Sequence, residues 1–162
     1  MDKQIIKLST LLGEKLKAEG LKIATAESCT GGGIAQAITE IAGSSAWFDR
    51  GFVTYSNLSK VQMLGVKQAT LDDFGAVSEE VANEMVEGAL VHSEADLAVA
   101  VTGIAGPAGG SELKSVGTVY ITYGIKGRQS ISYKHVFKGN RADVRKQTII
   151  SALYKCLESI KA

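Results

Sequence analysis

The sequence predicts a single-domain α/β fold, a three-layer α/β/α sandwich around a mixed, mostly parallel sheet with a C-terminal β-hairpin. Apolar residues at three- and four-residue steps mark helices on either side of strand-like runs. Residues 97–101 are apolar on both alternating faces, which is typical of a central strand covered by helices on each side. Because 162 residues can bury one full core, residues 1–162 are expected to form one domain.

In the first third of the chain, helices alternate with strands. Residues 3–19 carry an apolar face and stop at Gly20, as a helix with a glycine C-cap does. Residues 21–24 then read as a strand, which leads through a tight turn into a second helix that should run until Gly43. Residues 48–55 look extended and should form the next strand.

Most of the elements that follow begin or end at a recognisable signal. Ser56 is suited to cap a short helix that stops at Gly65, and Thr70 to Asp73 resembles a capping box. Ser78 opens a longer helix through Leu90. After the strand at 97–101, two runs form a hairpin around Lys126 and Gly127, and the last helix starts at Asn140. These two runs are 116–123 and 129–137.

The charge balance, the apolar runs and the cysteine and histidine positions limit which ligands and partners the protein can have. With 18 Lys and Arg against 17 Asp and Glu, the formal charge is +1, so nucleic acid is not a favoured partner. The apolar runs are strand-sized, which excludes a membrane span. The two cysteines, Cys29 and Cys156, lie far apart, which favours a reducing cytoplasm. His92 and His135 have no second ligand at a metal-binding spacing. We therefore expect a small-molecule ligand and neither a metal nor a cofactor.

The stretch TAESCTGGG, residues 25–33, reads as the end of a strand, a tight turn and the start of a helix. Ser28 would stand exposed at the strand end. The N–H groups of the three glycines that follow would lack partners in the first helical turn, so they could donate to an anion or to a developing oxyanion; these are Gly31, Gly32 and Gly33. Alternatively, Thr30 is an N-cap and the glycines form an ordinary turn.

A serine nucleophile with no histidine nearby needs another base, and a lysine with a lowered pKa is the usual substitute. Lys60 is the best candidate, because it lies in the first turns of a helix, where the dipole disfavours a further proton. Tyr55 could relay a proton or orient the substrate. The structural alternatives are a surface lysine and a core tyrosine. Cys29 is a competing nucleophile, but its side chain should point away from that of Ser28.

Two further stretches suggest ligand binding. A glycine-rich loop follows the strand at 97–101, and such a long loop after a core strand is usually functional; its candidate binding residues are Thr102, Gly103 and Gly106. Arg141 and Arg145 share one face at the start of the last helix, where basic residues oppose the dipole unless an anion is bound. They could clamp a phosphate or form a solvated basic patch.

The strings TAESCTGG, GSSAWFDRGFVTYSN, GAVSEEV, VTGIAGP and VGTVY occur in this order. Their order and spacing resemble the C-terminal domain family of the bacterial competence/damage-inducible protein CinA, over nearly the whole chain. The resemblance implies an α/β/α fold and an amidohydrolase of pyridine nucleotide salvage, which converts nicotinamide mononucleotide to nicotinate mononucleotide and ammonia. Its serine and lysine correspond to Ser28 and Lys60. The family's pocket is expected at Tyr55, Thr102, Arg141 and Arg145.

Two positions depart from the family pattern. Ala108 stands where the second glycine loop usually has an acid, and Ser115 occupies a frequent proline position. Because the nucleophile and base motifs are intact, an active enzyme is expected. The alternative is a nucleotide-binding or regulatory module that keeps the fold without turnover. If the chain forms a homo-oligomer, a dimer is favoured.

Overall fold

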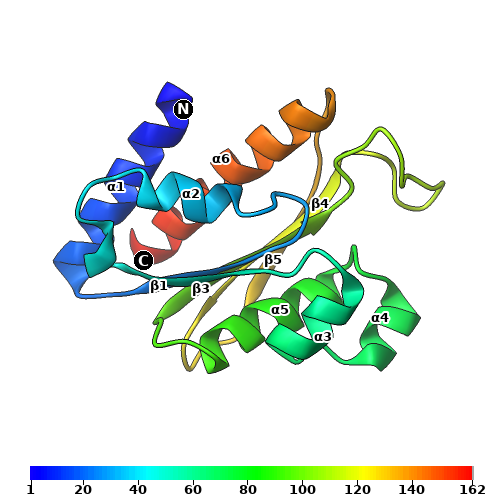
Figure 1. Ribbon diagram of the computed structural model, residues 1–162, viewed down its shortest axis with the longest axis horizontal. Coiled ribbons are helices and arrows are strands. Elements are labelled where there is room, and N and C mark those ends of the chain that lie inside the picture. Colours follow the sequence, from blue (N-terminus) through cyan, green and yellow to red (C-terminus); the bar gives the residue numbers. More distant parts are fainter. Residues whose placement is uncertain (162) are drawn as a thin grey trace.

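A five-stranded sheet forms the middle layer of the computed structural model, which describes residues 1–161 (Figure 1). The strand order is β2-β1-β3-β4-β5. β1 runs parallel to β2 and β3, whereas β4 runs antiparallel to β3 and β5. The strands are β1 (Ile23–Glu27), β2 (Phe48–Val53), β3 (Leu97–Gly103), β4 (Thr118–Ile125) and β5 (Ile131–Val136). The mixed sheet and its hairpin of β4 and β5 confirm the predicted architecture.

Helices cover both faces of this sheet. Figure 1 shows one layer made of α1 (Lys3–Glu19), α2 (Gly33–Thr39) and α6 (Arg141–Lys161). The opposite layer contains α3 (Asn57–Leu64), α4 (Gln68–Phe74) and α5 (Glu79–Val91). A 3-10 turn, η1 (Ser44–Ala46), precedes β2. None of the helices among the described residues has both the length and the apolar composition that crossing a bilayer requires.

The central strand β3 shows how the two cores are divided. Leu97, Val99 and Val101 belong to the core beneath α1, α2 and α6. Ala98 and Ala100, which alternate with them, belong to the core beneath α3 and α5. All five side chains are buried, which confirms that helices cover this strand from both sides.

Close approach between helices also fixes the position of α3. A Cβ atom at Gly88 of α5 would collide with the backbone of Leu64 at the end of α3. The absence of a side chain at this position therefore lets the two helices touch. Because Lys60 lies on α3, this contact helps to determine where its side chain reaches.

Most of the predicted helix signals are confirmed. Gly20 and Gly65 end their helices with φ of 67° and 71°, the left-handed geometry that glycine adopts without strain. The hydroxyl of Ser56 accepts a hydrogen bond from the N–H of Ser59, and Ser78 caps α5 in the same way.

Two predicted helix boundaries are wrong. α2 ends at Thr39 rather than near Gly43, because the chain turns through η1 and places Trp47 against Gly13 of α1. Thr70 does not open a helix, since α4 begins at Gln68. Its hydroxyl donates instead to the carboxylate of Glu84 at 2.6 Å, so tertiary contact replaces the predicted capping box.

Candidate active site

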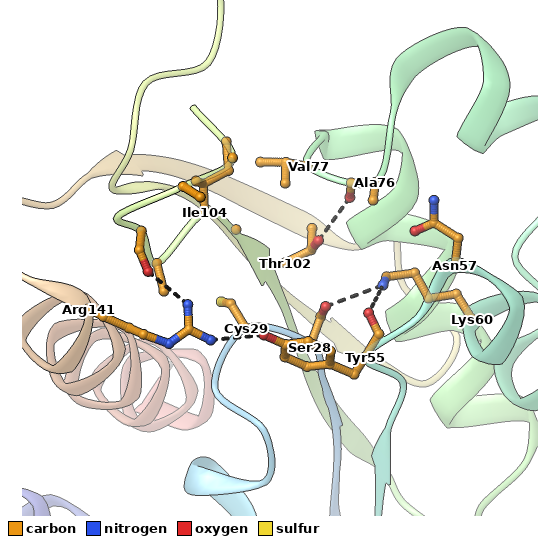
Figure 2. A pocket seen from close by; sticks show the side chains of 15 residues that line it. Ser28, Cys29, Tyr55, Asn57, Lys60, Ala76, Val77, Thr102, Ile104 and Arg141 are labelled. Atoms are coloured by element: carbon orange, nitrogen blue, oxygen red, sulfur yellow. Dashed lines mark hydrogen bonds between the residues drawn. The ribbon is translucent and has the colours of Figure 1, made fainter. Parts of the chain in front are cut away.

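A pocket of about 250 Å³ opens where β1 and β3 end (Figure 2). In α/β folds, ligands usually bind at the edge of the sheet where the carboxyl ends of the parallel strands lie. Four parts of the chain contribute the polar lining: the end of β1, the segment from β2 into α3, the end of β3 with its loop, and the start of α6. They bring together five of the predicted residues, namely Ser28, Tyr55, Lys60, Thr102 and Arg141, and also the glycines Gly103 and Gly106.

Ser28 and Lys60 point toward each other across this pocket (Figure 2). The Nζ atom of Lys60 lies 3.2 Å from the Oγ atom of Ser28, within hydrogen-bonding distance. Lys60 Nζ also donates to the backbone carbonyl oxygens of Thr54 and Tyr55, at 3.0 and 3.2 Å. The Ser28 backbone is itself fixed, because its N–H donates to the carbonyl of Val101 at 3.1 Å.

Burial determines the charge state that Lys60 prefers. The residue is only 1% exposed, and no carboxylate among the described residues forms a salt bridge with it. Removal of the ammonium group from water lowers the pKa of Lys60 below its ordinary value. Burial is the largest cause of this lowering, and it depends on the tertiary packing of α3 rather than on the helix dipole considered from the sequence.

Cys29 is a poorer nucleophile than its position in the turn suggests. The residue is only 5% exposed, and burial raises the pKa of Cys29 to about 11. The thiolate, which is the reactive form, is therefore scarce at neutral pH. The lysine amine lies beside Ser28, which is the serine expected to react.

A buried carboxylate that the sequence argument missed occupies the start of α2. Glu27 is fully buried, and its Oε1 accepts the hydroxyl of Thr30 at 2.6 Å and the N–H of Ile34 at 2.8 Å. Its Oε2 accepts the N–H of Ala35 at 3.0 Å. A signal was present in the sequence, because α2 has no acid in its first turn and Glu27 closes the preceding strand.

Hydrogen bonds within the turn itself use two of the donors that were expected to face a ligand. The N–H of Gly31 donates to the carbonyl of Ser28, and that of Gly33 donates to the carbonyl of Thr30, each at 3.0 Å. The prediction of three free amides is therefore wrong for Gly31 and Gly33. Neither these glycines nor Gly32 and Thr30 line the pocket. The N–H of Cys29, directly after Ser28, donates to no other residue in the described part of the chain.

Tyr55 and Arg141 form a bridge at the edge of the pocket (Figure 2). The Nη2 atom of Arg141 donates to the Tyr55 hydroxyl at 2.9 Å, and Nη1 donates to the carbonyl of Gly106 at 2.8 Å. Tyr55 is 58% exposed, so it is not the core aromatic considered as an alternative. The backbone carbonyl of Tyr55 contacts Lys60, whereas its hydroxyl contacts Arg141.

Arg145 lies apart from this bridge. Its Nη2 atom donates to the backbone carbonyl of Thr30 at 3.1 Å, and the residue is not part of the pocket lining. The two arginines therefore start from one helix face but reach different segments. Of the predicted two-arginine clamp, the structure brings Arg141 but not Arg145 into the described pocket lining.

The second glycine loop is shaped by contacts with the sheet. The hydroxyl of Thr102 donates to the carbonyl of Ala76 at 2.9 Å, which ties the end of β3 to the segment before α5. A Cβ atom at Gly103 would approach the Thr118 carbonyl oxygen to 2.8 Å, so packing requires glycine there. The described residues contain no group of three His, Cys, Asp or Glu side chains that could hold a metal ion.

Comparison with known proteins identifies close relatives. A family model described as the CinA C-terminal domain matches residues 5–160. The chain is 53% identical over 152 residues to the nicotinamide-nucleotide amidohydrolase PncC of Escherichia coli, covering 94% of this chain and 92% of that protein. It is 52% identical to the protein of the same name from Pseudomonas putida, covering 92% of each. The crystal structure of competence/damage inducible protein CihA from Agrobacterium tumefaciens superposes with a TM-score of 0.96 at 45% identity, covering 100% of this chain and 98% of that one.

Proposed function

Because the chain belongs to the CinA C-terminal domain family, we propose that it is a nicotinamide-nucleotide amidohydrolase that uses Ser28 as nucleophile and Lys60 as base. The reaction converts nicotinamide mononucleotide and water to nicotinate mononucleotide and ammonia. The observation that carries the proposal is the 3.2 Å contact between Lys60 Nζ and Ser28 Oγ, two buried side chains that line an open pocket. The high identity to two proteins named for this activity supports the choice of substrate.

The hydrogen bonds of Lys60 suit a neutral amine. A neutral amine has two N–H groups and one lone pair, and the carbonyls of Thr54 and Tyr55 can take both N–H groups. The lone pair then faces the Ser28 hydroxyl and can accept its proton. The lowered pKa of Lys60 increases the fraction of the enzyme in this form at neutral pH.

The proposed reaction has two halves. Ser28 Oγ attacks the carboxamide carbon while its proton moves to Lys60. Lys60 then gives that proton to the leaving nitrogen, the C–N bond breaks, and ammonia departs from an ester on Ser28. Water, deprotonated by Lys60, attacks the ester carbon, and Lys60 returns the proton to Ser28 as nicotinate mononucleotide leaves.

The negative charge on the tetrahedral oxygen needs a donor that the turn has not already used. The N–H of Cys29 meets this condition among the described residues, and Cys29 lines the pocket. In many serine hydrolases the amide of the residue after the nucleophile has this role. We therefore assign the oxyanion to the Cys29 amide in place of Gly31 and Gly33.

Arg141 is the proposed partner of the nucleotide phosphate. It is the one arginine in the described pocket lining. A guanidinium group has about five N–H donors, so the two hydrogen bonds to Tyr55 and Gly106 leave others for a phosphate. The Tyr55 hydroxyl holds the guanidinium at the pocket edge, where it would meet the ligand.

The test is to mix the purified protein with nicotinamide mononucleotide and to measure ammonia and nicotinate mononucleotide together. Both products should appear in equal amounts, and the Ser28→Ala variant should form neither. Nucleotide binding without ammonia release by the parent protein would instead indicate the non-catalytic module.

A further inference from the structure

Thr30 is held from two sides in the turn that carries Ser28. Its hydroxyl donates to Glu27 Oε1 at 2.6 Å, and its carbonyl accepts from Arg145 Nη2 at 3.1 Å. We propose that Glu27, Thr30 and Arg145 are positioning residues that set the place of Ser28 Oγ relative to Lys60 Nζ, and that Thr30 and Arg145 do not bind the substrate. This inference rests on the proposed function.

The Glu27 side of the network joins the turn to the sheet and to α2. Glu27 is the last residue of β1 and pairs with Val53 and Val101 in the flanking strands. Its buried carboxylate accepts the N–H groups of Ile34 and Ala35, so the first turn of α2 cannot move without breaking these bonds. Ser28 therefore follows a residue that is fixed by both its backbone and its side chain.

The Arg145 side joins the turn to α6. Val144 and Thr148, on either side of Arg145 along the helix, are fully buried and anchor α6 in the core. The guanidinium also lies against Gly31, where a Cβ atom would be 3.3 Å from Nη2. Gly31 has φ of 59°, so the turn places its backbone, without a side chain, next to the arginine.

Both hydrogen bonds act on Thr30, two residues after Ser28, and thus on the place of Ser28. A displacement of about 1 Å between reacting groups can cost roughly 10²-fold in rate. Loss of either contact should therefore lower kcat by roughly tenfold to a hundredfold. KM should change little, because no substrate contact is removed.

Two matched pairs of variants test this. Thr30→Val keeps the branched shape and loses the hydroxyl, whereas Thr30→Ser keeps the hydroxyl and should recover most of the rate. Arg145→Met keeps an apolar stem and loses the guanidinium. Lys146→Met removes the neighbouring cation, which pairs with Asp2, and should leave the rate unchanged.

The readout is kcat and KM with nicotinamide mononucleotide, and kcat/KM with nicotinamide riboside, which lacks the phosphate. Positioning predicts that Arg145→Met lowers kcat/KM for both substrates by the same factor. An increase in KM for the mononucleotide alone would make Arg145 a phosphate ligand and overturn the proposal. Equal losses in Thr30→Val and Thr30→Ser would also overturn it, because the hydroxyl would then be irrelevant.

A fluorophosphonate probe that labels reactive serines separates this inference from the proposed function. Its labelling rate at Ser28 should fall in Thr30→Val and Arg145→Met, with melting temperatures reported alongside to identify variants that fail to fold. If the parent protein labels at Ser28 but releases no ammonia, the proposed function fails and the labelling rates still decide the positioning. If the folded parent protein is not labelled at Ser28 and also releases no ammonia, both the positioning proposal and the proposed function are overturned.

Discussion

Replacing Lys60 with methionine should abolish most turnover while leaving nucleotide binding intact. The methionine would fill the same buried volume but could not accept the proton of Ser28. A general base contributes about 10²–10⁴-fold to the rate, so kcat should fall by that factor with KM nearly unchanged. Lys60→Arg should be as inactive, because a guanidinium stays protonated at every accessible pH.

The dependence of the rate on pH measures how much of Lys60 is present as the neutral base. A lysine with the ordinary pKa of about 10.4 would be neutral in about one molecule in 10³ at pH 7.4, which corresponds to about 4 kcal/mol. Burial of Lys60 lowers its pKa, and each unit of lowering makes the base ten times more abundant. Activity should therefore rise with pH along a limb that lies below the ordinary lysine value and then level off.

The lowered pKa of Lys60 also makes the free energy of unfolding depend on pH, in a direction that can be predicted. Because the folded state disfavours the protonated amine, the unfolded chain binds the proton more tightly between the lowered pKa and the ordinary one. The free energy of unfolding should rise with pH through this window, and Lys60→Met should lose that part of the dependence. Denaturant unfolding at several pH values measures it.

The assay is ammonia release at saturating and limiting mononucleotide from pH 6 to 11, beside calorimetric binding to each variant. A Lys60→Met variant that keeps more than about a tenth of kcat would refute the role of base. A variant that loses binding but keeps kcat would make Lys60 a ligand instead. If activity rises with pH only near the ordinary pKa of lysine, burial does not lower the pKa of Lys60 in the working enzyme.

Four further substitutions test the nucleophile, the phosphate contact and the packing of α3. Ser28→Ala should lose at least about 10³-fold in kcat and Cys29→Ala should keep most of it, as measured by ammonia release; the reverse pattern would move the chemistry to the thiol. Arg141→Ala should weaken mononucleotide binding by roughly 1.5–3 kcal/mol, a tenfold to hundredfold rise in KM, while the poor reaction of the riboside hardly changes. Equal use of riboside and mononucleotide by the parent would argue against a phosphate contact. Gly88→Ala should destabilise the fold by about 1–3 kcal/mol through its clash with α3, seen as a lower melting temperature, and an unchanged melting temperature would contradict the close packing.

The sequence predicted the layered fold and the meeting of Ser28 with Lys60, because both depend on local signals that tertiary packing did not override. Strand, turn and helix around Ser28 follow from glycine spacing and apolar periodicity. Ser56 places Lys60 in the first turn of α3, and a parallel neighbour strand brings α3 to the same edge of the sheet.

The partners of the polar side chains could not be predicted in this way. Glu27 turns inward because three donors surround it, two of them on α2, and a single strand position does not reveal such a cluster. Arg141 and Arg145 share a helix face, yet they end on Gly106 and Thr30, which belong to loops far away in the chain. Long side chains reach whatever the tertiary fold offers, so spacing alone cannot assign their contacts.

Among the strands of the described residues, β2 lies at the edge of the sheet and pairs with β1 alone. The two carbonyls that hold the amine of Lys60 follow directly after this strand, whereas Ser28 follows the interior strand β1. Edge elements open locally at a lower free-energy cost than the whole domain unfolds. Ser28 of the proposed catalytic pair thus follows an interior strand, whereas the two acceptors of the Lys60 amine follow an edge strand. Local opening of β2 would therefore remove the acceptors that orient the proposed base, although the rest of the sheet stayed folded.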